Sequence, residues 1–328
     1  MSSASTDWLL RTRLNLRQLA LLVSLDERRS ILHAASATHL TQPAASKLLS
    51  ALESSFGVKL FVRHSRGVEP TPCGEIIVRH ARGVLAELRQ AQEEIAAIGE
   101  GVRGEVAIGT EVTSATWLVS RAVAALKRDY PDIRVGIEVN FSESLTAGLL
   151  NREFDIVIAR LHHVGRLSGV EFEELKEAPH GLVVRRGHPL MGKRALSLKD
   201  LVTQTWIVPP VGNISRDRFS ELFLRTRTPF PRSVVETTDL SVIVELLRSS
   251  DMVAPLAMEL AQPFCESKVL GVLPLDLKVR LGAAGIVTRG EQQLSPASRV
   301  ALRVLRETAR EVLGAAHEER RPARVRRG

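Results

Sequence analysis

In the last two thirds of the sequence, side chains that can hold a small anion follow the short apolar runs expected to form strands. Hydroxyls at helix N-termini beside an arginine donate hydrogen bonds to a carboxylate and favour its charge. We therefore predict a site for a small, carboxylate-bearing ligand, with Arg160 paired to the carboxylate. The predicted set is Thr110, Thr113, Ser114, Asn140, Ser142, Arg160, Pro209, Gly212, Thr237 and Thr238. Each hydroxyl taken alone is better explained as a simple helix cap, and it is their convergence from several strand ends that favours a ligand site.

A second group of residues, between positions 41 and 66, suits contact with nucleic acid. Apolar residues at helical spacing, among them Ala45, Leu49 and Leu52, predict a helix face packed on a core. The opposite face carries small polar and basic side chains that can reach base edges or phosphates in a major groove, and a basic turn follows the helix. The predicted DNA contacts are Thr41, Gln42, Pro43, Ser46, Lys47, Ser50, Arg63, His64 and Arg66.

Positive charge is concentrated around these predicted DNA contacts. The formal net charge is +8, and from Arg11 to Arg82 eleven Lys and Arg stand against five Asp and Glu. From His317 onward, five arginines stand against two glutamates. A basic segment gains affinity for a polyanion because it releases counterions from the phosphates. Charge alone is equally consistent with a solvated basic surface.

Residues that serve catalysis or metal binding in other proteins lack the required spacing here. Gly99–Gly104 fits the pattern G-x-G-x-x-G, but it follows a helical pattern and precedes a strand, the reverse of a dinucleotide site, and we interpret it as a hinge. The adjacent His162 and His163 would point to opposite faces of a strand. Cys73 stands at a helix start without a resolving cysteine nearby, so we expect no redox switch. We expect no cofactor, no metal and no enzymatic activity.

Three regions of different pattern must position these groups. Residues 14–71 show short helical patterns followed by a hairpin, and residues 72–98 show one uninterrupted helical pattern. From 105 to 314, β-branched runs alternate with amphipathic helices, which is typical of an α/β domain whose strand ends bind ligands. We expect strands at 105–109, 133–139, 154–159, 180–186, 206–208, 232–237, 252–255 and 281–287, and helices at 114–129, 144–151, 215–226, 239–249 and 296–313.

The 72–98 segment predicts a dimerisation helix. Its apolar residues step alternately by four and three positions, a heptad seam that needs a partner helix. The seam is Ile77, Ala81, Val84, Leu88, Ala91, Ile95 and Ile98. Since no second heptad helix follows in the chain, we expect self-pairing into a symmetric dimer that presents two DNA-binding helices. The alternative is a helix that lies on its own C-terminal domain.

One pattern runs through the N-terminal region in fixed order: Ala34-Ala35, Leu40, Gln42-Pro43-Ala44-Ala45-Ser46, Leu52-Glu53, Phe56-Gly57, Leu60-Phe61, Arg63, Val68, Thr71 and Gly74. It resembles the winged helix-turn-helix of LysR-type transcription regulators, and the α/β remainder extends the resemblance to nearly the whole chain. The resemblance implies dimers that pair into tetramers and a two-lobed, periplasmic-binding-protein-like domain. It also implies an effector in the cleft between the lobes, where Thr113 and Ser142 match family positions. Around Glu27–Ser30 the sequence is similar to the branch that controls protocatechuate catabolism or sugar-uptake genes.

The sequence thus predicts a cytoplasmic bacterial regulator that binds double-stranded promoter DNA as a dimer or tetramer and contacts RNA polymerase. The expected divisions are a flexible extension (1–13), a winged helix-turn-helix (14–71), a dimerisation helix (72–98), a hinge (99–104), an effector-binding α/β domain (105–314) and a basic disordered tail (315–328). Within the α/β domain we expect lobe I at about 105–163 and 268–314 and lobe II at about 164–267.

Two other classes of protein are the alternatives. A solute-binding protein would be exported, but the polar start lacks the features of a signal peptide, and no apolar run approaches the roughly 18 residues of a membrane span. A small-molecule enzyme would turn over the ligand of the α/β cleft, but no nucleophile, metal or cofactor motif supports it.

Overall fold

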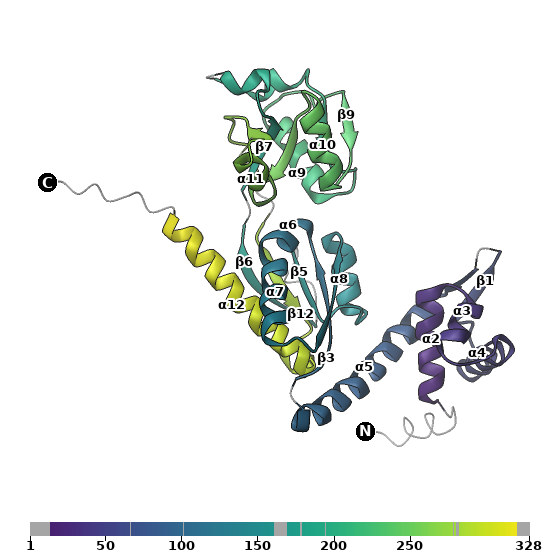
Figure 1. The fold of residues 1–328 in the computed structure, drawn as a ribbon. Coiled ribbons are helices and arrows are strands. Elements are labelled where there is room, and N and C mark those ends of the chain that lie inside the picture. Colours follow the sequence, from purple (N-terminus) through teal and green to yellow (C-terminus); the bar gives the residue numbers. More distant parts are fainter. Residues whose placement is uncertain are drawn as a thin grey trace.

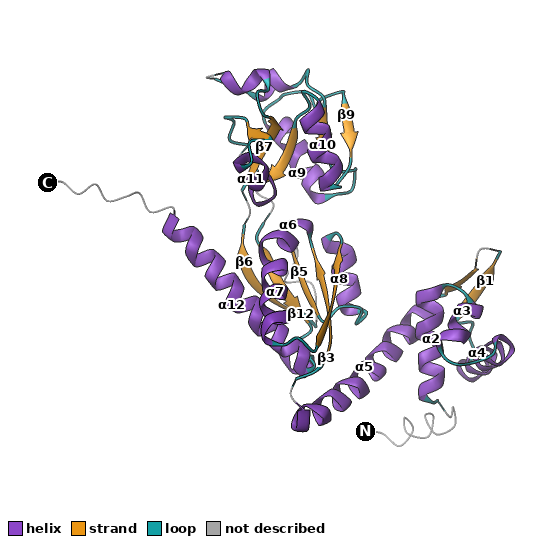
Figure 2. Cartoon of the chain, in the orientation of Figure 1, coloured by secondary structure: helices purple, strands orange, loops and turns teal. Residues whose placement is uncertain are grey.

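The computed structural model describes residues 14–65, 67–100, 102–160, 169–177, 179–193, 195–277, 279 and 282–319. Figure 1 shows a small N-terminal domain joined by one long helix to two α/β lobes, and Figure 2 shows that both lobes contain strands. The predicted extension 1–13 lies outside the described residues. Within the described part of the chain, no helix is long and apolar enough to cross a membrane.

The N-terminal domain is a three-helix unit closed by a hairpin. Its elements are α2 (Leu16–Arg28), α3 (Ile31–Ala37), α4 (Gln42–Phe56) and the antiparallel strands β1 (Phe61–His64) and β2 (Gly67–Pro70). The hydroxyls of Ser30 and Thr41 cap α3 and α4, since each accepts a backbone N–H of the first helical turn. The predicted core face of α4 is confirmed, because Ala45, Leu49 and Leu52 are buried.

A buried carboxylate fastens α4 to the hairpin. Glu53 is 7% exposed, and its Oε1 accepts the backbone N–H groups of Leu60 at 3.0 Å and Phe61 at 3.3 Å. Its Oε2 accepts a hydrogen bond from Lys59 Nζ at 2.6 Å. Burial raises the pKa of the Glu53 carboxyl, but the hydrogen bonds from Lys59 and the two backbone amides outweigh it, so the net pKa is lowered.

One helix, α5 (Pro72–Glu100), leads from the N-terminal domain to lobe I, which confirms the predicted 72–98 helix. Its 29 residues span about 44 Å at 1.5 Å per residue. The predicted hinge 99–104 is wrong at both ends, because residues 99 and 100 continue the helix and Gly104 begins the next strand. The link between the two elements is therefore short.

Lobe I is built on a five-stranded sheet of order β4-β3-β5-β12-β6. Strand β3 pairs in parallel with β4 and β5, and β12 runs antiparallel to β5 and β6. The strands are β3 (Gly104–Thr110), β4 (Ile133–Val139), β5 (Ile156–Arg160), β6 (Glu171–Lys176) and β12 (Ala284–Thr288). The helices are α6 (Val112–Ser114), the π-helical turn η1 (Ala115–Val119), α7 (Ser120–Asp129), α8 (Ser142–Leu150), the 3₁₀ turn η5 (Glu291–Gln293) and α12 (Pro296–Glu319).

Alternation along β5 divides the core of lobe I in two. Ile156 and Ile158 pack with η1, α7 and α12, whereas Val157 and Ala159 pack with α8. Because successive strand residues point to opposite faces, α8 covers one face of the sheet and the other helices cover the second. Figure 1 shows α8 on the side of lobe I that faces the N-terminal domain.

Lobe II contains an antiparallel sheet of order β10-β7-β11 and a parallel pair, β8 and β9. Its strands are β7 (His180–Arg185), β8 (Trp206–Val208), β9 (Val234–Glu236), β10 (Ala254–Ala257) and β11 (Leu270–Val272). Its helices are α9 (Ile214–Arg225), α10 (Leu240–Ser249), α11 (Met258–Glu266) and the 3₁₀ turns η3 (Pro189–Gly192) and η4 (Leu198–Leu201). The core centres on Trp206, Phe219 and Phe223, which are all at most 2% exposed.

The predicted division of the lobes is wrong at two places. Residues 171–176 were expected in lobe II, but they form β6, which pairs with β12 in the lobe I sheet. Residues 270–272 were expected in lobe I, but they form β11, which pairs with β7 in lobe II. The predicted tail also begins too early, since α12 continues to Glu319; residues 320–328 lie outside the described part.

Candidate functional site

A cavity of about 480 Å³ lies between the two lobes, at the ends of β3, β5 and β8. Side chains from both lobes line it, including the N-terminal residues of α8 and α10. Seven of the ten predicted ligand-binding residues are among them: Thr113, Asn140, Ser142, Arg160, Pro209, Thr237 and Thr238. The cavity thus brings together predicted residues that are up to 125 positions apart in the sequence, from Thr113 to Thr238.

The other three predicted residues do not line this cavity. Thr110 is fully buried, and its hydroxyl donates to the Glu111 carbonyl at 3.1 Å. Ser114 is also fully buried. Gly212 lies in a turn with φ +89°, and its neighbour Asn213 lines the cavity instead, with its side chain capping α9. The cavity therefore gives no support to these three as ligand-binding residues.

Glu111, which is absent from the predicted set, organises the lobe I side of the cavity. Its carboxylate accepts a hydrogen bond from the Ser142 hydroxyl and forms an ion pair with the Arg160 guanidinium. Arg160 is 7% exposed, and its Nε has no hydrogen-bond partner among the described residues. Arg160 therefore meets the cavity already paired on one side, with one donor unused. An acidic residue directly after a strand end was the available signal.

The cavity wall is more acidic than predicted. Among the described residues that line it, Arg160 is the sole Lys or Arg, whereas Glu111, Glu143 and Asp239 are acidic. Asp239 is partly occupied, since its side chain caps α10 through the Val242 N–H at 3.0 Å. Most other polar lining groups are hydroxyls and amides. Such a wall offers hydrogen-bond acceptors for ligand hydroxyls, and its acidic groups disfavour a ligand with additional negative charge.

A polar surface of α4 and the β1–β2 hairpin is the second candidate site. Thr41, Gln42, Pro43, Lys47 and Ser50 are exposed, and Ser46 is half-buried, on the side of α4 opposite its core residues. Arg63 and His64 are exposed on β1, and His64 Nε2 lies 3.9 Å from Glu69. The predicted contact Arg66 lies outside the described residues. All described members except Ser46 are thus exposed.

The predicted heptad seam is buried at its start and exposed beyond it. Ala81 is 1% exposed and Ile77 is half-buried, because α5 begins by packing on the N-terminal domain. The exposed members are Val84, Leu88, Ala91 and Ile95. The Ile98 side chain lies outside the described part. An apolar stripe along a helix is left without a partner in the described part of this chain.

Neither cysteine nor metal chemistry gains support from the structure. Cys73 is exposed at the start of α5 and Cys265 is half-buried in α11, and both are free thiols. In the described ranges, no group of three or more His, Cys, Asp or Glu side chains could hold a metal ion. The pair His162–His163 lies outside them.

Two family models match the chain, one over its N-terminal domain and one over its two lobes. Residues 16–75 match the family model described as bacterial regulatory helix-turn-helix protein, lysR family, and residues 99–310 match the LysR substrate binding domain. The chain is 38% identical over 301 residues to the HTH-type transcriptional regulator GbpR of Azospirillum brasilense, covering 92% of this chain and 88% of that protein.

Solved structures share the fold of the full chain. A full-length variant of OxyR from Pseudomonas aeruginosa superposes with a TM-score of 0.66 at 24% identity, covering 90% of this chain and 95% of that one. Full-length CbnR complexed with its target DNA gives 0.61 at 21% identity, covering 90% of this chain and 100% of that one. The matched families are regulators and not enzymes. The chain belongs to the LysR family of DNA-binding transcriptional regulators, with a helix-turn-helix domain and a substrate-binding domain.

Proposed function

We propose that this chain binds promoter DNA as a dimer or tetramer, with Gln42, Ser46 and Lys47 reading base edges and Arg63 touching the backbone. The observation that carries the proposal is the exposed polar face of α4, opposite the buried face that fixes the helix on its domain. A helix held in this way can enter a major groove without disturbing its core. Binding at a promoter in the cytoplasm would bring the chain within reach of RNA polymerase.

DNA binding is tested with the fragment upstream of the protein's own gene, compared with random DNA over a range of salt. We expect specific, salt-sensitive binding that a Gln42→Ala/Lys47→Ala variant loses. Arg63→Ala alone should reduce the slope of log affinity against log salt by about 1, because Arg63 is assigned to the phosphate backbone. If neither this fragment nor DNA recovered genome-wide is preferred over random sequence, the proposal fails.

We also propose that the interlobe cavity binds a small, hydroxyl-bearing effector with a single carboxylate. The Arg160 guanidinium, which lines the cavity, and the N-terminus of α8 can hold that carboxylate. The acidic groups Glu111 and Glu143 disfavour a second one, and the hydroxyls and amides of the wall suit ligand hydroxyls. Because Glu111 already pairs with Arg160, the carboxylate exchanges with Glu111 or binds on the free side of the guanidinium.

The effector class is tested with matched small carboxylic acids and their primary amides, using thermal shift and calorimetry. We expect acids to bind more tightly than their amides to the wild type, and this preference to disappear in Arg160→Ala. A neutral double variant, Glu111→Gln/Arg160→Gln, controls for the burial of an unpaired Glu111, and Arg121→Gln on the exposed face of α7 controls for lost charge. Equal affinity for acids in Arg160→Ala would exclude the assigned role.

A further inference from the structure

The helix α8 begins at the interlobe cavity, and Glu153, shortly after its end, contacts Arg82 of α5. At its first residue, the Ser142 hydroxyl donates to the Glu111 carboxylate, which also pairs with Arg160. At its last turn, the chain folds back, and the Glu153 N–H donates to the Gly148 carbonyl at 2.8 Å. The nine residues of α8 span about 14 Å as a rigid unit.

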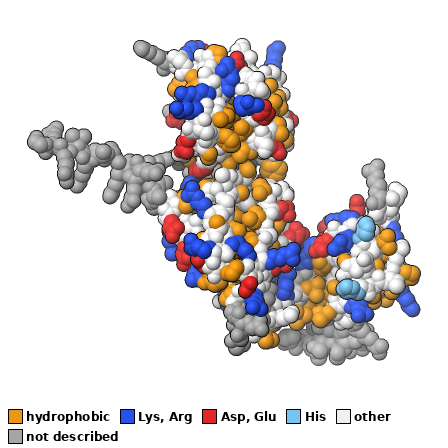
Figure 3. Space-filling model, viewed as in Figure 1, with side chains coloured by type: hydrophobic (Ala, Val, Ile, Leu, Met, Phe, Trp, Pro, Cys, Tyr) orange, Lys and Arg blue, Asp and Glu red, His pale blue; other side chains and the backbone are white. Residues whose placement is uncertain are grey.

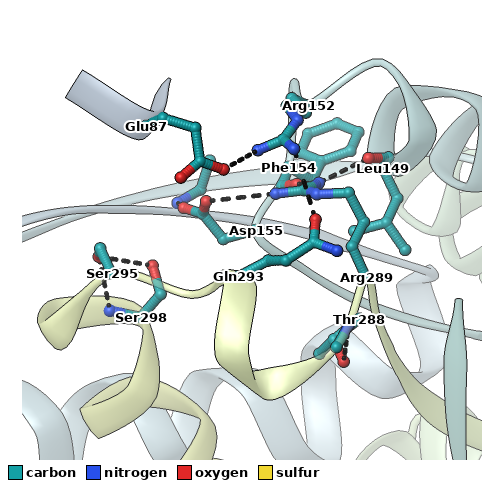
Figure 4. Close-up of polar contacts among 12 residues, drawn as sticks. Glu87, Leu149, Arg152, Phe154, Asp155, Thr288, Arg289, Gln293, Ser295 and Ser298 are labelled. Atoms are coloured by element: carbon teal, nitrogen blue, oxygen red, sulfur yellow. Dashed lines mark hydrogen bonds and ion pairs between the residues drawn. The ribbon is translucent and has the colours of Figure 1, made fainter. Parts of the chain in front are cut away.

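Glu153 is packed along this last turn. A Cβ at Gly148 would lie 3.2 Å from Glu153 Oε2 and 2.6 Å from Phe154 Cε2, so both side chains lie directly on the helix backbone. Arg289 closes the turn, since its guanidinium donates to the carbonyls of Leu149 and Phe154 at 2.5 Å each. Figure 4 shows Arg289 between these carbonyls and Asp155. A displacement of α8 therefore moves Glu153 with it.

The Glu153 carboxylate holds the N-terminal domain through one arginine. Arg82 of α5 donates to Glu153 at 2.9 Å and to Asp26 of α2 at 2.8 Å. The Arg82 and Asp26 side chains are only 11% and 14% exposed. Asp26 also pairs with Arg29 at 3.1 Å, and the Arg29 carbonyl accepts the N–H of Val68 on β2 at 2.9 Å. Figure 3 shows charged side chains of both signs gathered where the N-terminal domain meets lobe I.

Further contacts fix α5 against the end of α8. Arg152 pairs with Glu87 of α5 at 3.3 Å, as Figure 4 shows, and a Cβ at Gly83 would lie 3.3 Å from Arg152 Nε. Farther along α5, Glu94 pairs with Arg299 of α12 at 2.6 Å. The side chains of these two pairs are more exposed than that of Arg82, and solvent screens them more strongly. They therefore contribute less to the position of α5 against lobe I.

We propose that α8 relays the state of the interlobe cavity to the DNA-binding domain, with Arg82 as the positioning residue that joins Glu153 to Asp26. The inference rests on the proposed function, because it names the residues through which effector binding in that cavity changes the DNA-binding domain. A ligand that takes Arg160 or Ser142 from Glu111 frees the N-terminus of α8, and the shift reaches α2 and the hairpin through Glu153, Arg82 and Asp26. Packed elements transmit such shifts because they move between discrete arrangements.

The relay is tested by a double-mutant cycle on the full chain, without a ligand. Glu111→Gln disturbs the cavity end, Arg82→Gln cuts the contact with the N-terminal domain, and Arg121→Gln is the charge-matched control. Affinity is measured for promoter DNA that the protein itself selects. We expect Glu111→Gln to change this affinity about fivefold or more in the wild-type background and less than about 1.5-fold in Arg82→Gln.

Hydrogen exchange of residues 24–29, measured without DNA, provides a second readout. Glu111→Gln should alter exchange there, and Arg82→Gln should abolish this response. Equal fold-changes in both backgrounds, or no response to Glu111→Gln in either readout, would overturn the relay. Loss of all DNA binding by the wild type would instead refute the proposed function, and the exchange readout would still decide the relay. If Arg82→Gln fails to fold, Glu153→Gln cuts the same contact from lobe I.

Discussion

At the scale of single residues, buried carboxylates act by holding backbone groups as well as cations. Glu53 satisfies two N–H groups of the turn into β1 that would otherwise be buried without partners. Each such group costs about 1–3 kcal/mol when left unpaired. Glu111 has a similar place in lobe I, where it accepts hydrogen bonds from Ser142 and Arg160. In both cases the carboxylate is part of the scaffold of a surface that we assign to binding.

Replacing Glu53 should destabilise the N-terminal domain in a pH-dependent way. We expect Glu53→Gln to cost about 1–3 kcal/mol at pH 7, because a neutral amide accepts more weakly from two backbone donors and Lys59. The lowered pKa of Glu53 means that its contribution is complete above the unfolded value of about 4.3 and is lost as the pH falls through the folded value. The difference between wild type and variant should therefore shrink below about pH 4.

The measurement is the opening free energy of the Leu60 and Phe61 amides from hydrogen exchange, corrected for intrinsic rates. Glu75→Gln on the exposed side of α5 removes the same charge without these contacts and should change little. A wild-type-to-variant difference that stays constant from pH 3.5 to 7 would show that Glu53 does not act through its charge.

The sequence predicted a residue's place in the binding site where that place depends on its position at a strand end or helix start. It did not predict roles that depend on a partner distant in the sequence. Seven predicted residues line the cavity, because strand ends and helix starts are local features. Glu111 was missed because its role arises from Arg160, 49 positions away, and from Ser142. The same partner leaves Arg160 less available to a ligand carboxylate than its type alone suggests.

At the scale of elements, close backbone approach at Gly74 sets the start of α5. A Cβ at this position would lie 1.9 Å from the Leu60 carbonyl oxygen, in front of β1. Because a backbone atom cannot yield, Gly74→Ala should push the first turn of α5 away and destabilise the N-terminal domain by about 1–3 kcal/mol. Gly83→Ala in the same helix meets only the flexible end of Arg152, so it should be neutral or slightly stabilising. Urea unfolding and amide exchange of both variants measure the contrast, and equal effects would refute it.

The exposed part of the heptad seam should control self-association. Leu88→Asp places a charge in the centre of the stripe that contains Val84 and Ile95, so we expect it to shift the dimer towards monomer. Gln90→Asp introduces the same charge on the side of α5 away from the seam and should leave the mass unchanged. Analytical ultracentrifugation at micromolar concentration distinguishes the two. An unchanged mass for Leu88→Asp would show that another surface holds the dimer.

Elements with a strong local period could be predicted from the sequence, whereas strands defined by distant pairing could not. The 72–98 helix follows from its seam alone. Strand β6 was missed because its sequence, Glu171–Lys176, is largely charged and shows no apolar alternation; as an edge strand it is defined only by pairing with β12, more than 100 positions later. That omission displaced the first predicted boundary between the lobes, and the unpredicted strand β11 displaced the second.

At the scale of the whole molecule, α5 borders lobe I on one side and leaves an apolar stripe exposed on another. Arg82, Ala86 and Arg89 border the space between α5 and lobe I. Val84 and Leu88, at 100° per residue, point about 100–160° away from these. The sequence analysis treated self-pairing and docking on the chain's own domain as alternatives, but the geometry allows both at once. A dimer formed along the stripe would then hold each N-terminal domain at a fixed position relative to its own lobe I.

The affinity of such a dimer for DNA should depend on the distance between the two half-sites. Inserting 5 base pairs between them rotates one half-site by about half a turn, so we expect affinity to fall to that of a single half-site, and a 10-base-pair insertion to restore part of it. Leu88→Asp should bind all three DNAs equally, because its N-terminal domains are no longer joined.

Arg82→Gln should keep the dimer but tolerate the 5-base-pair insertion better than the wild type, since its N-terminal domains are freed from lobe I. Wild-type affinity that is indifferent to spacing would show that α5 does not set the separation of the two DNA-binding helices.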